Sequence, residues 1–91
     1  MDTATAKNQL RFNVYQRLEK GGRRHYLNVR NKVIRKFQIS PNTWDLWCKK
    51  KADSSLHGDF PALVLLFLST EMNVPIECFF TENKDEKCLE L

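Results

Sequence analysis

The segment from Pro41 to Lys50 carries side chains suited to binding a nucleic acid. On a helix, at about 100° per residue, its two tryptophans face one side, and Asn42, Leu46 and Lys49 face the other. Asparagine can bond N6 and N7 of adenine together, leucine can touch a thymine methyl group, and lysine can reach guanine or a phosphate. The pattern is compatible with a helix that enters a major groove, and equally with an ordinary amphipathic helix whose outer face is solvated.

Residues that could support catalysis do not form a recognisable set. The sequence contains no G-x-S-x-G motif, no H-E-x-x-H motif and no glycine-rich phosphate loop. Asp53, Ser54, Ser55 and His57 lie together on one short polar segment, which cannot supply a buried and oriented triad. We therefore expect neither an enzyme nor a site for a small-molecule substrate.

The three cysteines, Cys48, Cys78 and Cys88, are odd in number and irregularly spaced, and no C-x-x-C pair occurs. We expect three free thiols, as is typical of the reducing cytoplasm, with no disulfide framework, no metal and no cofactor. The longest apolar run, 60–68, has nine residues, far short of the roughly 20 that span a bilayer. The first residues lack the pattern of a signal peptide. We therefore expect a cytoplasmic protein without a membrane segment.

Charge divides the chain into two unequal halves. Residues 1–51 carry thirteen Lys and Arg against three acids, a net charge of +10. Residues 52–91 carry two Lys against eight acids, a net charge of −6. Such an asymmetry indicates that the first half meets a polyanion, for which a nucleic acid is one candidate.

Hydrophobic spacing predicts an all-α fold, a compact bundle of about five short helices. Leu10, Val14 and Leu18 recur every four residues and indicate a first helix over about 6–20, which ends at the glycine pair 21–22. A β-hairpin that turns at this glycine pair is the alternative, because hydrophobic residues also alternate on both sides of it.

A tight connection joins the next two predicted helices. The second helix begins within 23–29 and ends at Phe37, and the third spans 41–50. Ser40 suits an N-cap because the following proline holds it extended, and that proline suits the first helical position. Only the three residues 38–40 therefore separate the two helices.

The second half of the chain predicts two further helices. A fourth helix begins near Asp59 as its cap, has Pro61 in its first turn and ends at Asn73, which can take the left-handed position. A polar loop over 51–58 precedes this helix, and a short fifth helix over 74–80 follows it.

Residues 29–50 and 60–80 resemble the helix-turn-helix proteins of the phage repressor/Cro family of bacterial regulators. The first block has the helix, three-residue turn and helix, and the second contains the run Val74-Pro75-Ile76-Glu77 that resembles a common ending of that family. The resemblance implies a lambda-repressor-like fold and sequence-specific binding to double-stranded DNA, as a transcriptional regulator or a repressor derived from a phage or mobile element.

Carried over residue by residue, and together with the basic residues nearby, the resemblance implies two sets of contacts. The base-contacting residues are expected to be Asn42, Thr43, Leu46 and Lys49. The phosphate-contacting residues are expected to be Arg23, Arg24, Arg30, Ser40, Lys50 and Lys51. Trp44 and Trp47 match the core positions of the recognition helix. Gln38 stands where the family has a glycine, so this residue must adopt a strained backbone or the turn must differ.

The fourth predicted helix is apolar on all sides over 63–68, and two phenylalanines follow it. Exposed together, these side chains would form a patch larger than monomers usually tolerate. We therefore expect a domain over 1–80 that forms a homodimer, followed by a polar and loosely ordered tail over 81–91. The expected interface residues are Leu65, Leu68, Phe79 and Phe80. The alternative is that this helix is the central helix of one bundle, covered by the others.

A second class of function fits the same helical fold. The chain could be a protein-interaction module that does not bind DNA, with its basic face meeting an acidic partner. Binding to duplex DNA separates the two hypotheses, because it falls steeply with salt concentration.

Overall fold

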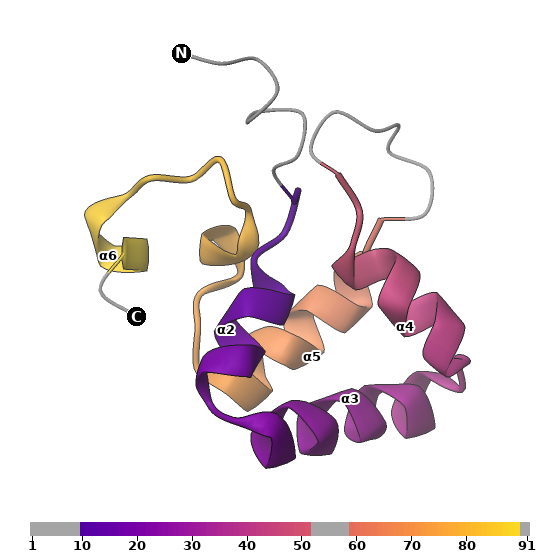
Figure 1. The fold of residues 1–91 in the computed structure, drawn as a ribbon. Coiled ribbons are helices and arrows are strands. Elements are labelled where there is room, and N and C mark those ends of the chain that lie inside the picture. Colours follow the sequence, from indigo (N-terminus) through magenta and orange to yellow (C-terminus); the bar gives the residue numbers. More distant parts are fainter. Residues whose placement is uncertain (1–9, 52–58, 90–91) are drawn as a thin grey trace.

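The computed structural model describes residues 10–51 and 59–89. This part of the chain contains no β-strand, and the prediction of a small all-α bundle is confirmed. In Figure 1, α3 lies along the lower edge, α4 rises from its C-terminal end, and α5 crosses the centre beside α2. The elements are α2 (Val14–Lys20), α3 (Arg23–Phe37), α4 (Pro41–Cys48), α5 (Ala62–Met72), the 3-10 helix η1 (Ile76–Phe79) and α6 (Glu86–Leu89).

Helix α2 is shorter than the predicted helix over 6–20, of which residues 6–9 lie outside the described part. Residues 10–13 are not helical, and Phe12 instead forms an isolated antiparallel bridge with Phe80. The Phe12 ring packs edge-on against Phe60, with the ring centroids 5.2 Å apart, and lies 5.1 Å from the ring of Phe80. The helical prediction is wrong here because pairing with distant segments outweighs a local hydrophobic period.

The glycine pair separates two helices and is not the turn of a hairpin. Gly21 follows α2, and α3 begins directly after Gly22. Gly22 has a φ of 97°, a backbone conformation that favours glycine. The alternative hairpin is therefore excluded.

The connection between α3 and α4 has the predicted length and the predicted cap. The Ser40 hydroxyl accepts a hydrogen bond from the Thr43 amide at 3.1 Å, with Pro41 at the first helical position. Gln38 has a φ of 53°, so it does adopt the left-handed conformation that the family glycine would favour. Helix α4 ends at Cys48, two residues earlier than predicted.

Helix α5 begins after Pro61 and not at Asp59. The Asp59 carboxylate pairs instead with the guanidinium of Arg11, which attaches the non-helical N-terminal segment to the start of α5. Asn73 has a φ of 56° and ends the helix in the left-handed conformation, as predicted. Within the described residues, none of the helices has the length and apolar character needed to cross a membrane.

The predicted dimer interface is wrong in three of its four residues. Leu65, Leu68 and Phe79 are buried within a single chain and belong to its core. Only Phe80 is exposed, with 42% of its surface accessible. An apolar residue already covered by its own chain cannot supply a contact surface to a partner, and the side of α5 that carries Leu65 and Leu68 faces the core of the bundle.

The C-terminal segment is fastened to the bundle, so the prediction of a loosely ordered tail is wrong. Cys78 and Cys88 form a disulfide, and Cys88 is buried. The Arg17 side chain bonds the backbone oxygens of both cysteines, at 3.3 and 3.1 Å. The prediction of three free thiols therefore fails for this pair, and with it the inference of a reducing cytoplasm from the cysteines.

Aromatic side chains form the centre of the core. Trp44 and Trp47 are buried, as predicted, and both lie against Phe60, with ring centroids 5.8 and 5.5 Å apart. The indole nitrogen of Trp44 donates a hydrogen bond to the hydroxyl oxygen of Tyr26 at 3.0 Å. This bond joins α4 to α3 inside the core, where an unpaired polar group would be costly.

Replacing Trp44 with alanine should lower the free energy of unfolding by about 3–5 kcal/mol, because the loss of a buried indole leaves a cavity. Trp44→Phe should cost less, since it retains most of the ring volume. Urea unfolding followed by circular dichroism measures both changes. A Trp44→Ala variant with unchanged stability would contradict the packing of α4.

Breaking the disulfide with Cys88→Ser should lower the free energy of unfolding by about 2–4 kcal/mol, because the unfolded chain regains the conformational entropy that closing the loop had removed. Amide hydrogen exchange should become faster in α6, whereas α3 should keep its protection until the whole chain unfolds. Chemical reduction of the wild-type protein should have the same effect. Equal protection of α6 in the reduced and oxidised proteins would rule out this role of the disulfide.

Candidate nucleic-acid interface

Helix α4 presents the outer face that its sequence predicts. Its two tryptophans point into the core, so the residues on the opposite side remain at the surface. Asn42 and Lys49 are exposed, and 62% of the Leu46 surface is accessible. The structure therefore brings three of the four predicted base-contacting residues together on one exposed strip, formed by α4 and by Lys49, the residue that caps its end.

The fourth predicted base-contacting residue, Thr43, takes part in the helix cap. Its hydroxyl oxygen lies 3.1 Å from that of Ser40, and its amide donates to the same Ser40 oxygen. Thr43 is half-buried and Ser40 is exposed. Both hydroxyl groups thus interact with each other at the start of α4, where they stabilise the first turn.

A pocket of about 300 Å³ opens between α2, α3 and α4. Three residues predicted to contact a nucleic acid, Arg23, Arg30 and Lys49, line this pocket together with one carboxylate, that of Asp45. Its lining residues are Tyr15, Arg23, Tyr26, Leu27, Arg30, Asp45 and Lys49. The basic groups reach the same pocket because Arg23 and Arg30 are seven residues apart, two helical turns, and therefore share one side of α3.

Two of the basic side chains that line the pocket contact neighbouring residues, one of them inside the pocket and one outside it. The guanidinium carbon of Arg23 lies 5.6 Å from the centroid of the Tyr26 ring, within the range of a cation–π contact. Arg30 donates a hydrogen bond to the side-chain oxygen of Asn31 at 3.0 Å. Burial raises the pKa of Tyr26, so its hydroxyl stays protonated at neutral pH. The charge of Glu19 and a hydrogen bond to it raise the pKa of Tyr15.

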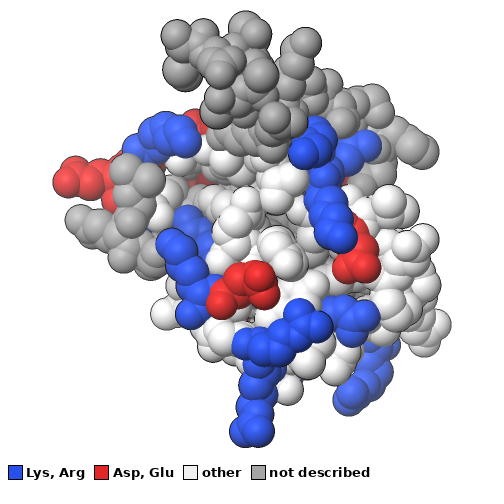
Figure 2. Space-filling view, viewed as in Figure 1, with Lys and Arg blue, Asp and Glu red and all other residues white. Residues whose placement is uncertain are grey.

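The remaining predicted phosphate contacts lie apart from the pocket. Arg24 and Lys51 are exposed, and the backbone oxygen of half-buried Lys50 accepts a hydrogen bond from the Arg11 amide at 2.9 Å. Figure 2 shows basic side chains over the lower part of the molecule and others near its right edge, with acidic side chains among them. The surface in this view is therefore mixed in charge and not uniformly basic.

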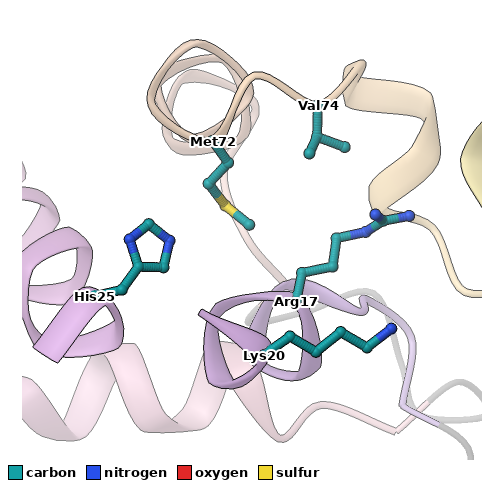
Figure 3. Close-up of a pocket in the computed structure, with 5 residues that line it drawn as sticks. All are labelled: Arg17, Lys20, His25, Met72 and Val74. Carbon is teal, nitrogen blue, oxygen red and sulfur yellow. The ribbon is translucent and has the colours of Figure 1, made fainter. Parts of the chain in front are cut away.

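A second pocket, of about 210 Å³, lies between α2, the start of α3 and the end of α5. Figure 3 shows Arg17 extending from α2 past Val74 and His25 directed toward Met72. The Arg17 guanidinium is engaged, since it also donates to the side-chain oxygen of Asn13 at 2.8 Å. The sequence did not single out Arg17, because its partners are backbone oxygens more than 60 residues away.

Cys48 is the one free cysteine among the described residues, and it is buried on the inner side of α4, as the last residue of that helix. Burial raises the pKa of its thiol to about 12, with the negative charge of Asp45 adding to the effect. Within the described ranges, no cluster of three or more His, Cys, Asp or Glu could hold a metal ion. The polar segment from Asp53 to His57 lies outside these ranges.

Comparison of the chain with protein-family models, with curated proteins and with solved structures finds no match. The resemblance to the repressor/Cro family therefore rests on the residues of 29–50 and 60–80 alone. What the chain binds has to be inferred from the exposed face of α4 and from the charged pocket beside it.

The thiol of Cys48 should resist modification in the folded protein. Only the thiolate reacts, and a pKa of about 12 leaves almost none of it at pH 8. Labelling with iodoacetamide at pH 8 should be slow in buffer and fast in denaturant, with mass spectrometry assigning the site. Rapid labelling in buffer would show that this thiol does not face the core.

The raised pKa of Cys48 also makes the stability of the fold depend on pH. The contribution of the buried thiol to the free energy of unfolding is fully present below about pH 9 and is lost as the pH rises toward 12, where the thiol ionises.

Proposed function

We propose that this chain is a sequence-specific regulator of transcription that binds double-stranded DNA through the outer face of α4. The observation that carries the proposal is the exposed strip of Asn42, Leu46 and Lys49 on a helix whose opposite face is anchored by two buried tryptophans. A helix of this kind can enter a major groove while its own domain holds it rigidly. The resemblance of 29–50 to repressor/Cro proteins supports the same function.

In this proposal each side chain of the strip has a separate role. Asn42 reads adenine through two hydrogen bonds, Leu46 touches a thymine methyl group, and Lys49 lies at the end of the strip within reach of the backbone or of guanine. An exposed leucine on a short helix is unfavourable in water and becomes favourable when it meets a methyl group. Thr43 and Ser40 would contribute from the helix start, where a backbone phosphate can accept their hydrogen bonds.

Basic residues on α3 and after α4 would hold the DNA backbone. Arg23 and Arg30 lie beside α4 in the pocket, whereas Arg24, Lys50 and Lys51 are spread around it. The net charge of +10 in residues 1–51 would favour association with a polyanion at low salt. Such a regulator would act in the cytoplasm of a bacterium, where its DNA lies, and the Cys78–Cys88 disulfide would have to persist there under reducing conditions.

A homodimer remains part of the proposal, with a different interface from the one first predicted. Leu63 and Leu66 on α5 have 70% and 54% of their surfaces accessible, and Phe80 is also exposed. To bind successive turns of one DNA face, a two-fold partner on such a surface would have to set the two recognition helices about 34 Å apart. The same exposed leucines favour the second candidate function, a protein-interaction module that does not bind DNA.

The test of DNA binding uses the wild-type chain and random duplex DNA at increasing salt. Binding should weaken with a log–log slope near −0.9 for each phosphate neutralised, and five contacts would give a slope of about −4 to −5. Gel shift or fluorescence anisotropy measures it. Failure to bind at low salt would leave the protein-interaction module as the better candidate.

Selection from random DNA supplies a preferred site for the test of the reading face. Asn42→Ala should weaken binding to that site by about 1–3 kcal/mol and relax the preference at one base pair, because the asparagine no longer bonds a base. Arg24→Gln is the matched control, since loss of a backbone contact should weaken preferred and random DNA alike. If Asn42→Ala also lost the same factor on both DNAs, the outer face of α4 would not read bases.

A further inference from the structure

We propose that the pocket between α2, α3 and α4 is a binding site for a single phosphate group, held by Arg23, Arg30 and Lys49. The assignment of that phosphate to a DNA backbone rests on the proposed function, whereas the site itself does not. Lys49, which its position on α4 offered as a base contact, becomes a phosphate contact in this arrangement. The phosphate can belong to DNA or to a small phosphorylated molecule, and the chemistry of recognition is the same.

The three basic side chains reach one pocket without an acidic partner for each. In the part of the chain that the structure describes, the ion pairs are Arg11 with Asp59, Lys32 with Glu71 and Lys87 with Glu77. None of them involves a basic side chain of the pocket. Arg30 from α3 and Lys49 from the end of α4 line the same pocket.

Two acids lie near enough to neutralise this cluster, and neither does so fully. Asp45 lines the pocket and offsets one positive charge. Glu19 is hydrogen-bonded to the Tyr15 hydroxyl. Three positive charges against one carboxylate in the pocket lining leave a local excess of two. Grouped positive charges repel one another, and an anion that bridges them relieves this repulsion.

The chemistry and the size of the pocket suit a phosphate. Its wall includes the side chain of Tyr26, whose ring lies under the Arg23 guanidinium and whose hydroxyl accepts the hydrogen bond from buried Trp44. Phosphate oxygens accept several bonds at once and suit the fork of a guanidinium group. The volume of about 300 Å³ lies at the small end of ligand sites, which suits one phosphate and its immediate substituent.

Titration of the ¹⁵N-labelled protein with inorganic phosphate at pH 7.5 tests the site, with chloride used to hold the ionic strength constant. Amide signals from 23–30 and 45–49 should shift together and reach saturation. Arg30→Gln and Lys49→Gln should each raise the dissociation constant about tenfold, through loss of a charge-assisted bond. Asp45→Asn should lower it about threefold or more, because it removes the one negative charge of the lining. A role of Asp45 confined to folding would not tighten binding.

Arg24→Gln is the matched control, since it removes the same charge next to Arg23 from an exposed position that does not line the pocket. It should leave phosphate binding within about twofold of the wild type. Shifts that do not saturate, or equal losses in Arg24→Gln and Arg30→Gln, would overturn the phosphate site. The spectra report at the same time whether each variant is folded.

A second arm with duplex DNA separates the two sources of the phosphate. If the wild type binds DNA, Lys49→Gln weakens that binding and inorganic phosphate competes with it, then the pocket holds a backbone phosphate. If phosphate binds in the pocket and DNA does not bind, the proposed function fails, whereas the site stands as one for a small phosphorylated molecule. DNA binding without saturable phosphate binding would keep the proposed function and remove this site.

Discussion

The position of Trp44 is the constraint on which the rest of the structure depends. Its indole is fully buried, donates to the Tyr26 hydroxyl and packs against Phe60, so that α3, α4 and the residues before α5 meet around one side chain. A polar nitrogen inside a core needs its partner, and only one rotation of α4 supplies it. That rotation decides which residues of α4 remain outside, and therefore what the helix can bind.

The same rotation connects the core to the charged pocket. With Trp44 inside, Asp45 and Lys49 lie along the edge of α4 that lines the pocket with Arg23 and Arg30 of α3. Tyr26 takes part in both places, because its hydroxyl accepts the indole bond and its side chain lines the pocket. A change in core packing would therefore alter the spacing of the basic groups, and the proposed DNA contacts and the proposed phosphate site depend on the same bond.

The two ends of the described chain stabilise the bundle by different means. Phe12 fills a place among aromatic rings, whereas the last helix is held by the Cys78–Cys88 disulfide and by Arg17, which bonds the backbone oxygens of both cysteines. A chain of this size buries only a modest fraction of its surface, so a covalent link and a bridging arginine add useful stability. The rest of the chain covers one side of the apolar helix α5, whereas Leu63 and Leu66 on its other side are exposed.

The sequence by itself determined those features whose causes lie within a few residues. The Ser40 cap, the left-handed Asn73 and the inward face of α4 follow from local hydrogen bonding, backbone sterics and helical periodicity, whereas the sequence left open whether Gln38 would be left-handed. Only the tertiary structure decided the late start of α2, the disulfide and the three basic groups that share one pocket. These depend on contacts between residues 10 to more than 60 positions apart, and a local pattern carries no information about which distant segments will meet.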